Sequence, residues 1–108
     1  MGASRGRALV TGGAGLIGSH LVDLLAEKNY GVTILDNLEP QTHPNGKPPW
    51  LNPNARFVEG DVRNETDLQR ALQGADFIFH LAAFGGFTPA ISKYIDANVI
   101  GTARLFVV

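Results

Sequence analysis

Cysteine is absent from the 108 residues of this chain. Its absence excludes a disulfide framework, a zinc or iron–sulfur site built on thiolates, and a cysteine nucleophile. An excess of one charge is lacking as well, because nine Lys and Arg residues oppose ten Asp and Glu residues and leave a net charge of −1. That balance excludes a generally basic nucleic-acid binder. The low net charge, together with a content of 44% hydrophobic residues, also excludes a disordered tail.

Long apolar runs are missing too. No stretch approaches the roughly 20 residues needed to cross a bilayer, and residues 1–7 lead into too few apolar residues for a signal peptide. We therefore expect a soluble, cytoplasmic protein with no membrane partner, no nucleic-acid partner and no metal site. The length corresponds to one domain. Glycine, by contrast, is abundant at 13 residues, and the positions of the glycines guide the interpretation below.

Strand-like and helix-like segments alternate along the chain. The runs typical of buried strands are 7–11, 31–36, 56–59 and 76–83. Helical spacing or capping signals predict helices from Leu16 to the Asn29–Gly31 stop, from an Asn64 cap with Asp67 at its third position to Gly74, and from Thr88–Pro89 to the chain end. Residues 37–54 hold all but one of the six prolines and predict a long surface loop.

This order predicts an α/β fold. Right-handed crossovers give a Rossmann-type doubly wound parallel sheet, partial, with four strands in the order 3-2-1-4 and three helices. The last residues, Leu105 to Val108, show neither a cap nor a turn. We expect residues 1–108 to be the N-terminal part of an NAD(P)-binding Rossmann domain, with a C-terminal catalytic and substrate part absent.

The glycine-rich turn after the first strand carries the strongest chemical signal. Gly13, Gly15 and Gly18 fit the pattern G-x-G-x-x-G, and Gly12, Gly15 and Gly18 fit the pattern G-x-x-G-x-x-G. The early glycines allow a tight turn with positive φ, Gly15 leaves room for a pyrophosphate, and Gly18 lets the helix lie close to the strand. Backbone N–H groups at the helix N-terminus then face the phosphates. The alternative is a glycine-rich turn that binds nothing.

Two acids follow at the ends of later strands. Asp36 lies about 20 residues after the glycines, where a carboxylate accepts hydrogen bonds from ribose hydroxyls and repels a 2′-phosphate. No Arg or Lys follows until Lys47, so NAD is favoured over NADP. Asp61 is a candidate acceptor for the adenine amino group, with Val62 covering the ring. The simpler interpretations are a solvated acid at Asp36 and a turn-forming residue at Asp61.

The remaining candidates lie in the predicted fourth strand or after it. His80 lies in an apolar run and is interpreted as a hydrogen-bonded core histidine rather than a ligand or base. Small residues after Leu81 could let a cofactor pass. The Phe84–Phe87 segment is either the floor of a substrate pocket or a flexible connector. Asn98 either fixes the loop after the fourth strand or is a surface residue.

Five ordered stretches together resemble the extended short-chain dehydrogenase/reductase family, and within it the NAD-dependent sugar-nucleotide epimerases and dehydratases. They are TGGAGLIGSHL (11–21), LDNL (35–38), GDVR (60–63), HLAA (80–83) and NVIGT (98–102). The resemblance extends from Ala8 to the end of the chain. Its nearest members are the UDP-galactose or UDP-glucose 4-epimerases and the dTDP-rhamnose 4-epimerases.

The resemblance implies NAD as cofactor and, in the full-length parent, a UDP- or dTDP-linked nucleotide-sugar substrate. A homodimer is a possible assembly. With Leu16 and Gly18 of the glycine-rich loop, the candidate cofactor-binding residues are Gly12, Gly15, Leu16, Ile17, Gly18, Asp36, Asn37, Asp61, Val62, Leu81, Ala82, Ala83 and Asn98.

No catalytic residue can be assigned. The family uses Tyr-x-x-x-Lys, in which a lysine lowers the pKa of the tyrosine base. Tyr30 and Tyr94 are the only tyrosines, and neither is followed by a lysine four residues later. Two hypotheses remain at this point. The chain is either the NAD-binding half of an epimerase or dehydratase that is inactive alone, or a stand-alone NAD-binding or regulatory module without chemistry.

Overall fold

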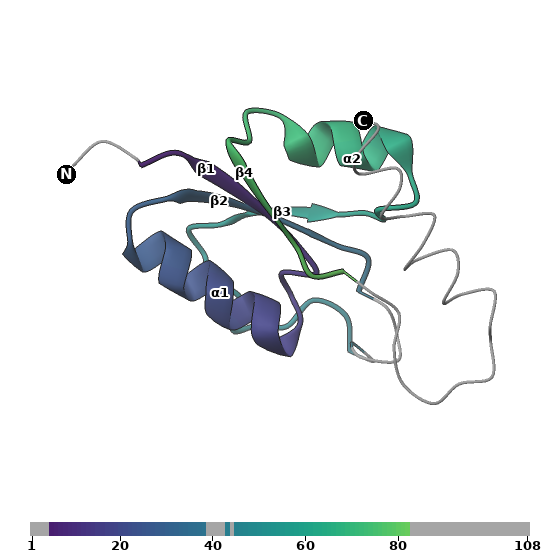
Figure 1. Ribbon diagram of the computed structural model, residues 1–108. Coiled ribbons are helices and arrows are strands. Elements are labelled where there is room, and N and C mark those ends of the chain that lie inside the picture. Colours follow the sequence, from purple (N-terminus) through teal and green to yellow (C-terminus); the bar gives the residue numbers. More distant parts are fainter. Residues whose placement is uncertain (1–4, 39–42, 44, 83–108) are drawn as a thin grey trace.

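The alternating segments fold into one parallel sheet with a helix on each face (Figure 1). The computed structural model describes residues 5–38, 43 and 45–82. Its elements are β1 (Arg7–Thr11), α1 (Leu16–Glu27), β2 (Gly31–Asp36), β3 (Arg56–Glu59), α2 (Glu65–Leu72) and β4 (Phe77–His80). The strand order β3-β2-β1-β4 confirms the predicted class and order. The third predicted helix, residues 88–108, lies outside the described residues.

Two hydrophobic cores lie on opposite faces of the sheet. Successive side chains of a strand point to opposite faces, so Ala8 and Val10 of β1 join one core while Leu9 joins the other. The first core includes Val22 of α1, and the second includes Leu68 of α2. Strand β1 carries apolar residues on both of its faces because each face packs into one of the two cores. It lies between β2 and β4, in the interior of the sheet.

The helix ends follow the predicted signals. Asn64 caps α2, because its side-chain oxygen accepts the Asp67 N–H at 3.0 Å. Gly74, with φ of +77°, lies just after the end of α2, and Asn29, with φ of 70°, follows α1. The helices have 12 and 8 residues. Within the described residues, no helix is long and apolar enough to cross a membrane.

The prediction of a buried strand over 76–83 is wrong in two respects. The observed strand is shorter, and Phe77, Ile78 and Phe79 are 48%, 47% and 37% exposed. The reason is tertiary. Helix α1 packs on β1 and β2, and α2 packs on β2 and β3, so neither described helix covers β4. Among the described strands, β4 is also an edge and pairs only with β1.

We expect this edge to promote association of the 108-residue polypeptide. Unpaired strand edges with exposed apolar side chains pair readily with other chains. Ile78→Lys should reduce association, since a lysine on an edge strand opposes pairing. Light scattering of both polypeptides is the measurement. A monodisperse, unmodified monomer with a high melting temperature would contradict this expectation.

Candidate functional site

An open pocket of about 1060 Å³ lies at the carboxyl ends of the strands. Strand β1 lies between β2 and β4 in the sheet, and the chain adds β2 and β3 on one side of β1 before it adds β4 on the other side. The strand order therefore reverses at β1, and the pocket lies at the carboxyl end of this strand. The volume of the pocket slightly exceeds the range of roughly 300–1,000 Å³ that is usual for small-molecule sites. Nine of the predicted residues line it: Gly12, Gly15, Leu16, Asp36, Asn37, Asp61, Val62, Leu81 and Ala82. Ala83 and Asn98 lie outside the described residues.

The glycine-rich loop is packed tightly at two of its positions. Gly12 has φ of +71°, and a Cβ there would come within 2.9 Å of the Ala82 nitrogen. A Cβ on Gly18 would overlap the Gly12 carbonyl oxygen and lie 2.9 Å from the Gly13 Cα. Gly18 therefore lets the start of α1 approach the backbone that directly follows β1. Gly18 does not line the pocket.

A Cβ on Gly15 would meet far less than one on Gly12 or Gly18. The Gly15 backbone is extended, with φ of −75° and ψ of 179°, and a Cβ there would meet only the Gly12 carbonyl oxygen, at 3.3 Å. Space is therefore left above the Gly15 backbone, where the sequence predicted a pyrophosphate.

The N-terminus of α1 has no cap of its own. Gly15 offers no side-chain hydrogen bond and the first turn holds no acid, whereas α2 has an Asn64 cap and two acids in its first turn. A helix leaves its first N–H groups without partners inside the helix, and these groups attract anions. The Leu16 and Ile17 side chains are 80% and 74% exposed. Ile17 does not line the pocket.

Asp36 lies at the end of β2 and is only 8% exposed. Its Oδ2 accepts the Ala14 N–H at 3.0 Å, and its Oδ1 accepts the Leu38 N–H at 2.9 Å. A carboxylate has about four acceptor positions, so further donors can still bind. The carboxylate is therefore fixed between the glycine-rich loop and the segment after β2, and it is not the freely solvated acid of the simpler interpretation.

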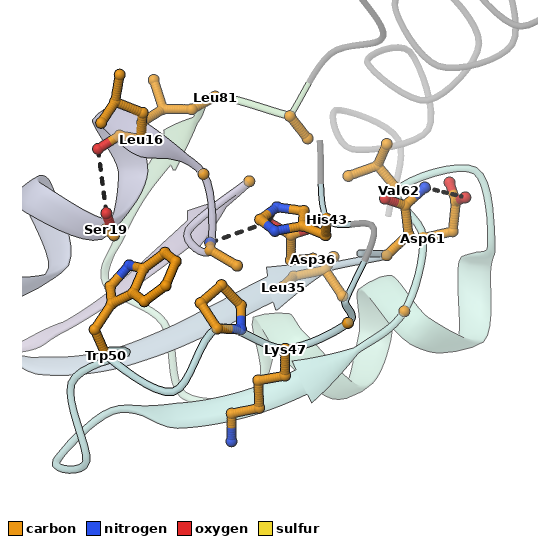
Figure 2. Close-up of a pocket in the computed structure, with 18 of the residues that line it drawn as sticks. Leu16, Ser19, Leu35, Asp36, His43, Lys47, Trp50, Asp61, Val62 and Leu81 are labelled. Atoms are coloured by element: carbon orange, nitrogen blue, oxygen red, sulfur yellow. Dashed lines mark hydrogen bonds and ion pairs between the residues drawn. The ribbon is translucent and has the colours of Figure 1, made fainter. Parts of the chain in front are cut away.

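His43 is the described side chain that lies against Asp36. Its Nε2 is 3.9 Å from Asp36 Oδ2, and both side chains are 8% exposed. Figure 2 shows this pair inside the pocket, with Trp50 on one side of the view and Asp61 and Val62 on the other.

Asp61 joins the two loops that follow β2 and β3. Its carboxylate accepts the Arg63 N–H at 2.8 Å, the Arg63 Nε–H at 2.9 Å and the Asn37 amide at 3.1 Å. Its own N–H donates to Asp67 of α2 at 3.0 Å. Burial alone would raise the pKa of Asp61, but the hydrogen bonds from Arg63 and Asn37 outweigh it and lower the pKa. Asp61 thus forms a turn, as one interpretation predicted, and still lines the pocket.

Thr11 fixes the chain after β4. Its Oγ1 accepts the N–H groups of Leu81 at 3.0 Å and Ala82 at 3.1 Å, and it lies 2.6 Å from His80 Nδ1. The Thr11 hydroxyl and His80 Nδ1 therefore share a hydrogen bond. Burial lowers the pKa of His80 and so favours the neutral imidazole. His80 is therefore a hydrogen-bonded, half-buried histidine, as the sequence indicated, and Thr11 holds Leu81 and Ala82.

His43, Trp50 and Arg63 are among the lining residues of the pocket that were not predicted. His43 and Trp50 come from the proline-rich segment, where no periodic pattern shows which side chains turn inward. Trp50 is 71% exposed even so. Arg63 belongs to the GDVR stretch, and its spacing of two from Asp61 is a signal for a local charged pair that could have been used.

The model of the family described as "NAD dependent epimerase/dehydratase family" matches residues 8–108. The chain belongs to the NAD-dependent epimerase/dehydratase family. This membership confirms the resemblance and the NAD cofactor predicted from the sequence.

Several similar proteins are epimerases of nucleotide sugars. The dTDP-L-rhamnose 4-epimerase of Burkholderia thailandensis is 36% identical over 92% of this chain and 29% of its own length. The UDP-glucose 4-epimerase of Thermotoga maritima, solved with UDP-glucose, has a TM-score of 0.82 and 38% identity over 94% of this chain and 33% of its own. The Thermus thermophilus UDP-glucose 4-epimerase, solved with NAD, has a TM-score of 0.78 and 30% identity over 94% and 32%. The chain thus spans about a third of the length of these epimerases and corresponds to their NAD-binding region.

The pocket is chemically suited to the cofactor of the NAD-dependent epimerase/dehydratase family. An uncapped helix N-terminus beside an open Gly15 suits a pyrophosphate. A buried carboxylate at Asp36 suits ribose hydroxyls. Both features line the same pocket, and Gly12 of the glycine-rich loop lines it as well. The residues present therefore fit a dinucleotide.

Proposed function

We propose that this chain is the NAD-binding part of a sugar-nucleotide epimerase or dehydratase. In the longer enzyme, NAD would transiently oxidise a hydroxyl of a UDP- or dTDP-linked sugar. The observation that carries the proposal is that one pocket at the switch point contains both the uncapped α1 N-terminus and Asp36. A cytoplasmic location and a homodimer are further parts of the proposal.

Each end of the pocket would hold one part of the cofactor. The N–H groups of Leu16 and Ile17, at the start of α1, would bind the pyrophosphate above Gly15. Asp36 would accept hydrogen bonds from the adenosine ribose, and Asn37, fixed by its bond to Asp61, would form the wall beside it. Val62, which is 6% exposed and belongs to the core on the α2 face, would present its side chain to the adenine.

The nicotinamide end would lie beside the chain after β4. Leu81 and Ala82 line the pocket next to Gly12, and Thr11 holds their N–H groups in place. When bound, NAD supplies a hydride acceptor. Ala83 and Asn98 are proposed to extend this part of the site. The residues of this chain thereby bind and orient the cofactor and leave proton transfer to residues elsewhere.

A second candidate is a stand-alone NAD-binding module. It is favoured by one feature of the sequence, the lack of any Tyr-x-x-x-Lys pair among the 108 residues. Both candidates bind NAD in the same way, so they differ only in whether a longer enzyme performs turnover. Sequencing the coding region on both sides of this segment separates them, because a Tyr-x-x-x-Lys pair in the same reading frame supports the epimerase or dehydratase.

We expect the chain to bind NAD in preference to NADP. The Asp36 carboxylate repels a 2′-phosphate. Lys47 is the first Lys or Arg residue after Asp36, but a cation–π contact holds its ammonium group 4.7 Å from the centroid of the Phe57 ring. Asp36→Ala should weaken NAD binding and narrow the gap to NADP, measured by calorimetric titration of both cofactors.

A matched control is Asp23→Ala. Asp23 is a second carboxylate lining the pocket, but its Oδ1 accepts a hydrogen bond from Asn52 at 3.1 Å. We expect its removal to leave the preference for NAD unchanged. Circular dichroism of Asp36→Ala is needed, because the Ala14 and Leu38 N–H groups lose their acceptor. Equal or tighter binding of NADP by the unmodified chain would contradict the expectation.

A further inference from the structure

An asparagine followed directly by a glycine lies in the wall of the pocket. Among the asparagines of the chain, Asn45 is the one with glycine as its next residue. Asn45 and Gly46 are both exposed, and both line the pocket. Gly46 has φ of +77°, in the left-handed region, and a Cβ there would meet nothing within 4 Å. The pair therefore occupies an open turn at the surface, with free space around its backbone.

Asparagine is a thermolabile residue, because its side-chain amide can be attacked by the backbone nitrogen of the next residue. In this pair, the Gly46 nitrogen loses its proton to the solvent and bonds to Cγ of Asn45. The Cγ–Nδ2 bond breaks, ammonia leaves and a succinimide ring remains. Water then adds to either ring carbonyl and opens the ring, which gives aspartate or isoaspartate. Glycine favours the closure, because it has no Cβ to hinder the nitrogen and its backbone is the least restricted.

Three other described asparagines are held by their side chains. The Asn37 and Asn52 amides donate to Asp61 and to Asp23, each at 3.1 Å. Asn64 caps α2 with its side-chain oxygen. Ring closure at any of these positions would first have to break the hydrogen bond of the attacked amide, and none of them is followed by glycine.

Asn54 is the best matched comparison, because it is also exposed. The Ala55 N–H, whose nitrogen would have to attack, donates to the Asn52 carbonyl oxygen at 3.2 Å. The Gly46 N–H donates in the same way to the His43 carbonyl oxygen at 3.0 Å. Both turns must therefore open before the reaction, and the two sites differ mainly in the side chain of the residue that attacks.

We propose that Asn45 is a site of spontaneous deamidation, and that the carboxylate formed there weakens binding of the dinucleotide. The second half of this inference rests on the proposed NAD site. The acids, lysine and arginine among the described lining residues are Asp23, Asp36, Asp61, Lys47 and Arg63. The two cations are engaged with the Phe57 ring and with Asp61. A further carboxylate in this wall therefore adds to the repulsion of the cofactor phosphates.

The first test is peptide mapping of the 108-residue chain after storage in warm, mildly alkaline buffer. Chymotryptic cleavage after Trp50 places Asn45 and Asn54 in different peptides. We expect the Asn45 peptide to be lost to aspartate and isoaspartate forms, which differ from it in mass and from each other in retention. The Asn54 peptide should remain unchanged. In Asn45→Gln, closure would require a larger ring, so no product should form at position 45.

The second test measures the effect of the new charge on the pocket. Asn45→Asp carries the carboxylate from the start, and Asn45→Gln is its neutral control. We expect Asn45→Asp to bind NAD roughly twofold to fivefold more weakly than Asn45→Gln at low salt, by calorimetric titration. The difference should shrink as salt is added, because ions screen an exposed charge. A merely structural effect of the substitution would not depend on salt in this way.

The outcomes keep the two proposals apart. If the Asn45 peptide stays intact, or converts no faster than the Asn54 peptide, the deamidation site is refuted and the NAD site is untouched. If Asn45→Asp and Asn45→Gln bind NAD equally at low salt, the effect on binding is refuted. If the folded, unmodified chain does not bind NAD at all, the proposed function is wrong and the effect on binding falls with it, whereas conversion of the Asn45 peptide would still establish the modification.

Discussion

Replacing Gly15 by valine should abolish NAD binding while the circular dichroism spectrum of the chain stays helical. The Gly15 backbone has φ of −75° and ψ of 179°, a conformation that valine adopts easily. A Cβ at this position meets only the Gly12 carbonyl oxygen within 4 Å, so the rest of the added side chain extends into the pocket. It would occupy the space that the pyrophosphate needs.

Gly18→Ala is the contrasting variant. Its Cβ would overlap the backbone of Gly12, which cannot move without breaking the turn between β1 and α1. We expect this variant to lose helical signal as well as NAD binding, whereas Gly15→Val loses binding alone. Calorimetry and circular dichroism on both variants are the measurements. Unchanged NAD affinity in Gly15→Val would show that the loop is only a turn.

The second large effect is the absence of turnover. We expect the 108-residue polypeptide with NAD to leave UDP- and dTDP-linked sugars unchanged. General acid–base catalysis contributes roughly 10²–10⁴ in rate, and this chain has no Tyr-x-x-x-Lys pair to supply it. Tyr30 packs edge-on against Phe77, with ring centroids 6.0 Å apart, and does not line the pocket. Tyr94 lies outside the described residues.

Chromatographic analysis of nucleotide sugars after long incubation is the measurement for this prediction. The Thermotoga maritima UDP-glucose 4-epimerase, assayed under the same conditions, is the positive control. Formation of an epimer or a dehydrated sugar by the polypeptide alone would contradict the prediction, and it would require a proton-transfer group that the pocket has not revealed.

Local signals predicted most of the fold correctly. The run at 7–11 stops at glycines, the one at 31–36 is β-branched, and Asn64 precedes an acid at the third helical position. Such signals act over a few residues, so they can be read without tertiary information. The burial of 76–83 could not be predicted in this way. Whether an apolar strand is covered depends on which helices cross it, and the two described helices pack on the other strands.

The candidate site shows the same division. Gly12, Asp36 and Asp61 were predicted because each lies at or just after the end of a strand, and parallel strands end at one edge of the sheet. His43 was not predicted, because a proline-rich segment has no period that shows which side chain turns inward. Its place beside Asp36 comes from the path of the whole segment across the pocket, which is a tertiary property.

Calorimetric titration of the unmodified 108-residue chain with NAD tests whether this segment is a cofactor-binding unit. We expect saturable binding at a single site per chain, together with a melting temperature that rises as NAD is added, because a ligand that binds only the folded state stabilises it. A chain that is folded by circular dichroism, yet shows neither heat of binding nor any rise in melting temperature with NAD, would show that the segment does not bind the cofactor.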